Sequence, residues 1–327
     1  MKRLVLVLVL FAALTGSAQA APRLLSVWRE NANPNGIVAT PGGDVWVLYA
    51  DVPKIVRYNV KGIQQLSITP AGLPVGIAAD AAGNLWVDDA NADAVTEYSR
   101  TGHQLVSWGN NTLFDQPFGL AFGPSGTLYL ADGTNNWVEP FSPTGAPSQA
   151  INGNGLYHPQ GVATDASGNV YVTDLDDNSV YVYSSSGAFV TKFGTEGSGN
   201  GQFELPAWVS VGSGHVFVTD ENNNRVQEFT TGGSFLTTWG SGGNGPGEFT
   251  NPLGISADVA GNVYVADQGN SRIQKFYLGP SPCSNLLRGH TTACDEEQTG
   301  CLNQLAPSKE VLCMNKVTAK YGRFRKH

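Results

Sequence analysis

The stretch GISADVAGNVYVADQGNSRIQKF, residues 254–276, decides the fold. Apolar, β-branched and aromatic residues gather in three short segments, at 254–257, 262–266 and 272–277, as in β-strands. Asp258 and Gly261 lie between the first two segments, where an Asp can accept backbone N–H bonds and a Gly can adopt positive φ. The stretch therefore predicts three short strands, the first two joined by a tight turn.

The same stretch occurs six times along the chain. The copies begin at steps of 40, 43, 42, 46 and 47 residues and align without an internal gap; they start at Gly36, Gly76, Gly119, Gly161, Ala207 and Gly254. One more strand-like segment separates successive copies: LVSW at 105–108, FVTKF at 189–193, FLTTW at 235–239, and weaker versions near 65–68 and 147–151. Four strands per period of this length are typical of a β-propeller blade. The sequence thus predicts an all-β, six-bladed propeller over residues 21–278.

The two ends of the repeat region complement each other. The last copy ends at Tyr277 without a fourth strand, whereas LLSVW at 24–28 precedes the first copy and matches the segments between copies. We expect this N-terminal strand to pair with the outside of the sixth blade and close the ring, which would leave no open end.

The N-terminal residues 1–20 resemble a secretory signal peptide. Lys2 and Arg3 precede an apolar run that is too short to span a bilayer, and Ala18-Gln19-Ala20 is a typical cleavage site. We expect a protein that is secreted or located in the periplasm or cell envelope, without membrane insertion; the alternative is an uncleaved anchor or a buried helix. After cleavage, 17 basic residues face 27 acidic ones, which argues against nucleic acid as a partner.

Residues 279–327 form a different segment, which holds all four cysteines: Cys283, Cys294, Cys301 and Cys313. In an exported chain an even number predicts two disulfide bonds, in one of three connectivities. A zinc site is the alternative, but no Cys-x-x-Cys pair is present. This tail has a net charge of +3 and residues 21–278 one of −13, so the tail either docks on the ring or remains a solvated appendage.

Residues 250–276 resemble the NHL repeat, whose pattern is a Pro-x-Gly start, an Asp-x-x-Gly-Asn turn, a Tyr-Val-x-Asp strand end and Asn-Asn-Arg-Ile-Gln-x-Phe. The resemblance covers about residues 22–278 and implies a six-bladed NHL-type propeller. Similar propellers include ligand- and protein-binding modules, sensor ectodomains and some enzymes, among them peptidyl-hydroxyglycine lyase and streptogramin lyase, and fold alone does not choose between them.

From this resemblance we expect a monomeric binding or scaffold module for a protein, a small molecule or a glycan. The alternative is a propeller enzyme, a lyase or hydrolase with its site in the central channel. The similar lyases use histidines near that channel, and His158 alone could lie near it in this sequence, so their sites do not carry over. We expect no catalytic residue, and no Gly-x-Ser-x-Gly nucleophile motif stands at a strand-to-helix turn.

An acidic residue ends the second strand in five copies. A side chain needed once per blade fits a structural role, because its carboxylate can bond the backbone of the loop that follows. An Asn three or four residues later, and Arg225 and Arg272 in two copies, would support it. The acids are Asp89, Asp132, Asp174, Asp220 and Asp267, with Tyr49 in the first copy.

Residues that break the repeat are the candidates for recognition. Loops after the second strand and loops leading into the next blade share one face, where insertions collect at 110–115, 152–158, 195–204 and 241–249. The candidate ligand face consists of Tyr49, Asp88, Phe118, Trp137, His158, Asp176, Asp177, Trp208, Glu221 and Asn222.

A calcium loop is an alternative for part of this face. Asp174, Asp176 and Asn178 place oxygen atoms at alternate positions, as calcium loops do. The EF-hand Gly and Glu are replaced by Ser179 and Ser185, however. We therefore expect a solvated acidic loop and predict no cofactor or metal.

Overall fold

The computed structural model describes residues 22–29, 31–49, 51–109 and 113–279. The predicted signal peptide at 1–20 and the predicted disulfide cysteines of the tail lie outside these residues. Both therefore remain predictions.

The described chain is all-β apart from one short 3-10 helix, and its strands form six separate sheets. Blade 1 contains β2 (Pro34–Ala39), β3 (Val45–Tyr49), β4 (Lys54–Tyr58) and β5 (Gln64–Ile68); blade 2 contains β6 (Pro74–Ala79), β7 (Leu85–Asp89), β8 (Ala94–Tyr98) and β9 (Gln104–Trp108); blade 3 contains β10 (Pro117–Phe122), β11 (Leu128–Asp132) and β12 (Trp137–Phe141). Blade 4 contains β13 (Pro159–Thr164), β14 (Val170–Asp174), β15 (Ser179–Tyr183) and β16 (Phe189–Phe193); blade 5 contains β17 (Pro206–Gly212), β18 (His215–Asp220), β19 (Arg225–Thr230) and β20 (Phe235–Trp239); blade 6 contains β21 (Pro252–Ala257), β22 (Asn262–Asp267), η1 (Gln268–Asn270), β23 (Arg272–Tyr277) and β1 (Arg23–Arg29).

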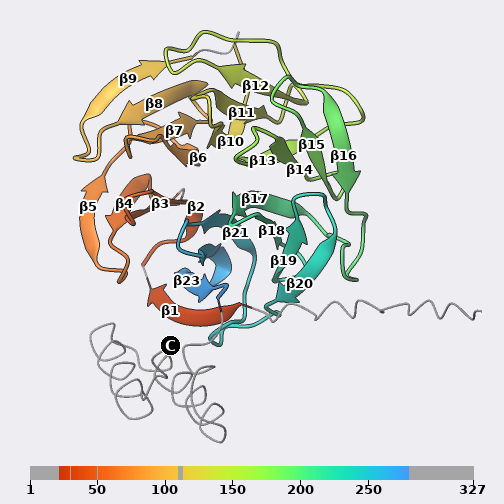
Figure 1. Ribbon diagram of the computed structural model, residues 1–327. Helices are drawn as coiled ribbons and strands as arrows, with labels where there is room; N and C mark the ends of the chain where they lie inside the picture. Colours follow the sequence, from red (N-terminus) through yellow and green to blue (C-terminus); the bar gives the residue numbers. More distant parts are fainter. Residues whose placement is uncertain (1–21, 30, 50, 110–112, 280–327) are drawn as a thin grey trace, which may run out of the picture.

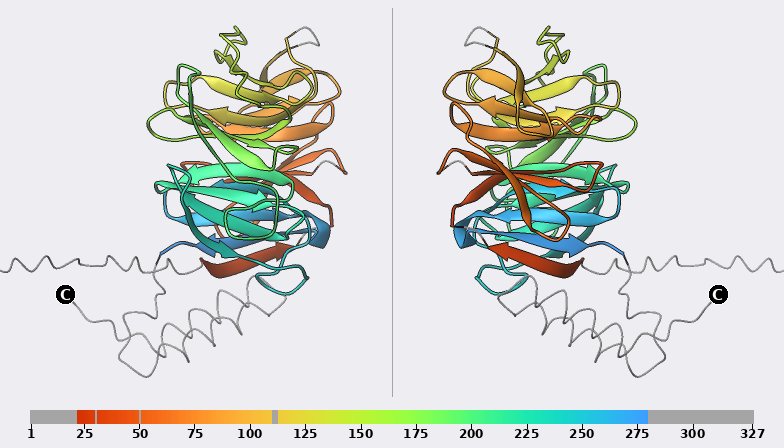
Figure 2. Two further views of the ribbon diagram at one scale, coloured as in Figure 1. Left: turned by 90° about the vertical axis from the view of Figure 1, so that its right-hand side faces the viewer. Right: turned by 90° about the vertical axis from the view of Figure 1, so that its left-hand side faces the viewer.

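The six blades form a closed ring, with the first strand of each blade innermost (Figure 1). Blade 6 has the order β1-β23-β22-β21, and β1 pairs antiparallel with β23. In the side views the red β1 ribbon lies along the blue β23 ribbon (Figure 2). The predicted six-bladed propeller and its closure by the N-terminal strand are therefore confirmed.

Blade 3 departs from the prediction of four strands. The segment expected near 147–151 makes only two isolated bridges, Val138 with Ile151 and Phe141 with Pro147. Pro140 and Pro147 have no N–H to donate, so a regular ladder cannot form between these segments. The segment near 65–68, whose strand pattern in the sequence is equally weak, does form the fourth strand of blade 1, β5.

The fifth copy is one residue shorter than the others between its first and second strands, so the gap-free sequence alignment places its first strand one residue out of register. Pro206 pairs with Asp220 as Pro252 pairs with Asp267, although the two prolines are 46 residues apart and the two acids 47. The missing residue lies in the turn at Ser213 and Gly214, which both have positive φ, as a two-residue hairpin turn requires. Trp208, rather than Ala207, therefore occupies the position that is glycine in the other five blades.

That glycine position lies at the seam between neighbouring blades. A Cβ at Gly119 would lie 2.4 Å from the carbonyl oxygen of Gln160 in the next blade. Glycine lets the innermost strands approach closely, and buried side chains of facing sheets fill the space farther out. The ring is thereby a tightly packed platform for its loops.

Candidate functional site

The recurring acid fastens the loops of blades 2 to 6. Oδ1 of Asp267 accepts the N–H of Thr250, and Oδ1 of Asp220 accepts the N–H of Glu204, both at 2.8 Å. The donors and acceptors in three other blades are Leu73 and Asp89, Asp115 and Asp132, and Tyr157 and Asp174. In these three blades the carboxylate also accepts an N–H from the loop that follows it. One acid thus joins the loop after its strand to the loop that leads into the blade.

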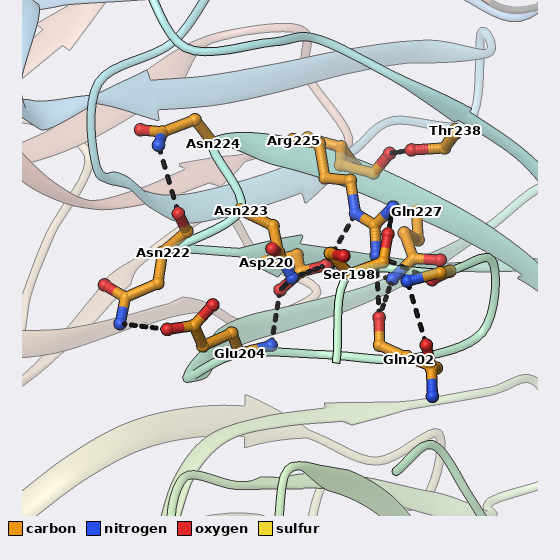
Figure 3. A network of polar contacts seen from close by, with 12 residues as sticks. Ser198, Gln202, Glu204, Asp220, Asn222, Asn223, Asn224, Arg225, Gln227 and Thr238 are labelled. Carbon is orange, nitrogen blue, oxygen red and sulfur yellow. Dashed lines mark hydrogen bonds and ion pairs between the residues drawn. The ribbon is translucent and has the colours of Figure 1, made fainter. Parts of the chain in front are cut away.

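The glycine-rich loops before blades 5 and 6 are each held by a larger network, and Figure 3 shows the one before blade 5. Arg225 donates from Nε to Asp220 at 2.7 Å and from its other nitrogens to the carbonyls of Ser198, Gly199 and Gln202, each at 2.8 Å. Gln227 donates to Asp220 and to Gln202. Blade 6 repeats this arrangement with Arg272, Asp267 and Gln274. These polar side chains bond their own loops.

In blade 1, which lacks the recurring acid, another residue bonds the loop that leads into the blade. Tyr49, which stands in place of the acid, is buried and its hydroxyl lies 2.8 Å from that of Tyr58. Asp51, two residues further on, accepts the N–H of Asn33 at 3.2 and 3.3 Å. Sequence reasoning missed Asp51 because it lies outside the repeat register.

The candidate residues lie around one face of the ring, which we call the connecting-loop face; it carries the loops between blades and the loops between second and third strands. Several of them are not available to a ligand. Tyr49 and Asp88 are completely buried, and Trp208 is only 8% exposed. Each occupies a strand position that points into the packed interior, which periodicity within a repeat did not reveal.

Other candidates are engaged in local contacts. The indole of Trp137 donates to Asp132 at 3.2 Å, Glu221 accepts from Asn251 at 3.3 Å, and the Asn222 amide lies 3.4 Å from Glu204. These residues remain partly or fully exposed.

Phe118, His158 and Asp176 come together at the seam between blades 3 and 4. Nδ1 of His158 lies 3.4 Å from Oδ2 of Asp176, and the Phe118 ring packs edge-on against the imidazole with centroids 6.0 Å apart. Gln160, which the sequence reasoning overlooked, places Nε2 3.5 Å from Nε2 of His158. We call Phe118, His158, Gln160 and Asp176 the blade 3–4 site.

The blade 3–4 site is specific to this part of the ring. At the position of Phe118 and Gln160 the other innermost strands carry Asn35, Val75, Ala207 and Leu253. Only a comparison of strand positions across all blades would have identified Gln160, because its own neighbourhood in the sequence is an ordinary strand start. The site combines an aromatic ring with an imidazole, an amide and a carboxylate.

Asp177 does not join Asp174 and Asp176 in an oxygen cage. It forms an ion pair with Lys192 and accepts from the hydroxyls of Ser179 and Tyr181 at 2.6 and 2.9 Å. Burial tends to raise the pKa of Asp177, but these hydrogen bonds outweigh it and leave the pKa below its ordinary value. Among the described residues, no three His, Cys, Asp or Glu side chains are placed to hold a metal ion together.

Described residues also line two cavities away from the blade 3–4 site. The channel encloses about 180 Å³ and is lined by residues of the six innermost strands. Among these lining residues there are hydroxyls but no His, Cys, Asp or Glu side chain. A pocket of about 640 Å³ opens on the opposite face, between first-strand turns of blades 2, 3 and 4. Its two acids are already bonded within their own turns, Asp80 by Asn84 and Asp165 by Asn169. Within 22–279, gaps apart, no helix is long and apolar enough to cross a membrane.

Comparisons with known proteins agree on the architecture. The family model DUF5128, described as a 6-bladed beta-propeller, matches residues 205–287. No curated protein matches. A streptogramin B lyase structure is similar with a TM-score of 0.60 at 14% identity, covering 81% of this chain and 100% of the other. The structure of catalytically inactive virginiamycin B lyase from Staphylococcus aureus with quinupristin has a TM-score of 0.56 at 18% identity, covering 76% of this chain and 81% of the other. A nidogen/laminin complex has a TM-score of 0.59 at 17% identity, covering 71% of this chain and 89% of the other.

These similar structures include both enzymes and a binding complex, and at such identities they show the fold alone. The sheet order, the closed ring and the family match agree with one another. The chain is therefore a six-bladed β-propeller.

Proposed function

We propose that this propeller is an exported binding module of NHL type that recognises a protein, small-molecule or glycan ligand on its connecting-loop face, centred on the blade 3–4 site. One observation carries the proposal: His158 of blade 4 contacts Phe118 of blade 3 across one seam and also lies next to Gln160 and Asp176 of its own blade, and the other blades do not share this group. Two blades must pack correctly to create this group, so the ring itself positions it.

The chemistry of the group suits a ligand with polar and apolar sides. Phe118 offers an apolar ring edge, and Gln160 and Asp176 offer a hydrogen-bond donor and acceptors on either side of the imidazole. His158 and Asp176 keep 32% and 51% of their side-chain surface exposed, so a ligand can reach them. A sugar ring or a peptide backbone presents matching groups.

The enzyme alternative has weaker support. A lyase or hydrolase in the channel needs acid–base groups there, and the described lining of the channel cavity offers none. The similarity to lyase structures concerns the fold only.

Photocross-linking tests the proposal. A photoreactive phenylalanine analogue at Tyr157, which is 61% exposed beside His158, should capture a ligand from an extract of the native compartment. The same analogue at His103, on a turn of the opposite face, is the matched control. Loss of one central contact should weaken binding of the captured ligand about tenfold or more in Phe118→Ala and His158→Ala, but not in His103→Ala. Equal capture from both positions, or unchanged affinity in both site variants, would contradict the proposal.

A further inference from the structure

The residue before the loop-fastening acid has a second bonding role in two blades. It is Thr173 in blade 4 and Thr219 in blade 5, both completely buried. Each hydroxyl accepts an N–H from the third residue of its own innermost strand, Gly161 at 2.8 Å and Trp208 at 2.9 Å. A hydroxyl at this position therefore serves as an acceptor towards its own blade.

The same hydroxyls donate across the seam to the next blade. Thr173 donates to the carbonyl of Ala207 at 2.9 Å, and Thr219 donates to the carbonyl of Leu253 at 2.7 Å. Both acceptors are the second residue of the neighbouring innermost strand. The position thus requires a group with one acceptor and one donor.

Asp88 occupies this position in blade 2 and is also completely buried. Its Oδ1 supplies the acceptor, because it takes the N–H of Gly76 at 2.6 Å and that of Val75 at 3.2 Å. Its Oδ2 has no hydrogen-bond partner among the described residues. An ionised carboxylate has no proton, so it could not donate the hydrogen bond to the next blade that Thr173 and Thr219 donate.

The missing acceptor is identified by the repeat and by geometry. The second residue of the next innermost strand is Phe118. A Cβ built on Gly76 would lie 2.2 Å from the carbonyl oxygen of Phe118 and 2.3 Å from Oδ2 of Asp88, so the two oxygens flank the same small space. Two acceptors that face each other away from water repel, unless one of them carries a proton.

We propose that Asp88 is a neutral carboxylic acid in the folded protein and that its O–H donates to the Phe118 carbonyl, which makes Asp88 a positioning residue for the blade 3–4 site. The acid replaces the threonine hydroxyl of blades 4 and 5 and joins blade 2 to blade 3. It acts through the backbone of Phe118, whose ring contacts His158. The part of this inference that concerns ligand binding rests on the proposed function; the protonation does not.

The surroundings favour the neutral form. Burial raises the pKa of Asp88 well above its ordinary value, the bonds from Gly76 and Val75 lower it in part, and the charge of Asp89 raises it further. The strands packed around Asp88 are β6, β8 and β10, which place Val75, Gly76, Val95 and Phe118 next to it. None of these four residues titrates, and Asp89 is the charged neighbour.

A spectroscopic titration tests the protonation in the full chain. Aspartate Cγ NMR resonances, assigned by comparison with Asp88→Asn, should include one that keeps its protonated chemical shift at about pH 7, far above the ordinary pKa. That signal should vanish in Asp88→Asn, and it should persist in Glu196→Gln, a control at an exposed carboxyl. An Asp88 resonance that is ionised at about pH 6 would overturn the proposal.

Stability and binding give a second readout. Asp88→Asn and Asp88→Thr each retain a donor and an acceptor, so both should fold and should lose the part of the pH dependence of Tm that Asp88 causes. Asp88→Ala, which removes the bridge, should also weaken cross-linking from Tyr157 several-fold, and Asp88→Asn should restore it. If protonation is observed but Asp88→Ala leaves cross-linking unchanged, the link to the blade 3–4 site is wrong and the inter-blade bond stands.

Discussion

Nε of Arg272 lies 2.5 Å from Oδ2 of Asp267, and neither side chain has any exposed surface. The remaining guanidinium nitrogens of Arg272 donate to the carbonyls of Asn244, Gly245 and Glu248 at 2.6–2.8 Å. Because each of the three guanidinium nitrogens donates at least one hydrogen bond, no nitrogen of this buried side chain is left without a partner. The pair therefore has a structural role: it holds the loop that leads into blade 6.

Arg272→Ala is expected to destabilise the ring strongly. It leaves the buried Asp267 carboxylate without its countercharge and removes one hydrogen bond from each of three loop carbonyls, a loss of about 3–5 kcal/mol. Arg225→Ala should cost less, because its side chain is 11% exposed and water can replace part of the network. Urea unfolding measures both, with exposed Arg29 as the control, where Arg29→Ala should change the free energy of unfolding by less than about 0.5 kcal/mol. Equal losses for Arg29 and Arg272 would refute this assignment.

Trp208→Gly is expected to destabilise the protein, although glycine occupies this position in the other five blades. Trp208 belongs to a buried cluster with Phe217 and Ile255, and removing a large buried side chain costs about 3–5 kcal/mol. Trp208→Phe should recover a large part of the loss. A Gly variant as stable as the natural protein would show that the neighbouring blades close the gap. Trp208 is for this reason a poor probe of ligand binding, in contrast to its place in the candidate face.

The pH dependence of stability should carry a contribution from Glu139. Burial, together with the charge of Asp132, raises the pKa of Glu139 from 4.5 to about 7. The folded protein therefore holds this proton more tightly than the unfolded chain, so the stability it contributes is present below pH 4.5 and is lost as the pH rises to about 7.

Glu139→Gln removes this titration, so its Tm should fall less than that of the natural protein across this pH range. Thermal unfolding at a series of pH values measures the difference. Identical slopes for both proteins would mean that Glu139 titrates alike in the folded and unfolded states. Asp88→Asn serves as an independent comparison, because the two carboxyls lie in different blades.

The repeat made the fold predictable. Each copy carries its own turn residues and alternating strands, and LLSVW before the first copy supplies the strand that the last copy lacks. What failed depends on single residues: Pro140 and Pro147 remove donors from the outer strand of blade 3, and a one-residue shorter turn moves Trp208 into the glycine position.

The candidate site was less predictable than the fold. A sequence identifies residues that break a repeat, but whether such a residue faces solvent or the next blade depends on packing between blades. Asp88 therefore entered the candidate face although it is buried, and Gln160 was missed although it contacts His158. Phe118, His158 and Asp176 were three of ten residues assigned to one face, and their mutual contacts depend on how blades 3 and 4 pack, which the sequence did not specify.

Gly119→Ala is expected to disturb the blade 3–4 site through the backbone. The added methyl group would lie 2.4 Å from the carbonyl oxygen of Gln160 and 2.9 Å from the nitrogen of Val162, both main-chain atoms of the next strand. Overpacking of this kind costs about 1–3 kcal/mol and forces β13 to shift. Because Gln160 belongs to β13, cross-linking from Tyr157 should fall together with the free energy of unfolding. Gly232→Ala is the control, since its methyl group would meet no atom closer than 3.8 Å. A Gly119→Ala protein that unfolds at a lower urea concentration but cross-links normally would show that the site does not depend on the position of β13.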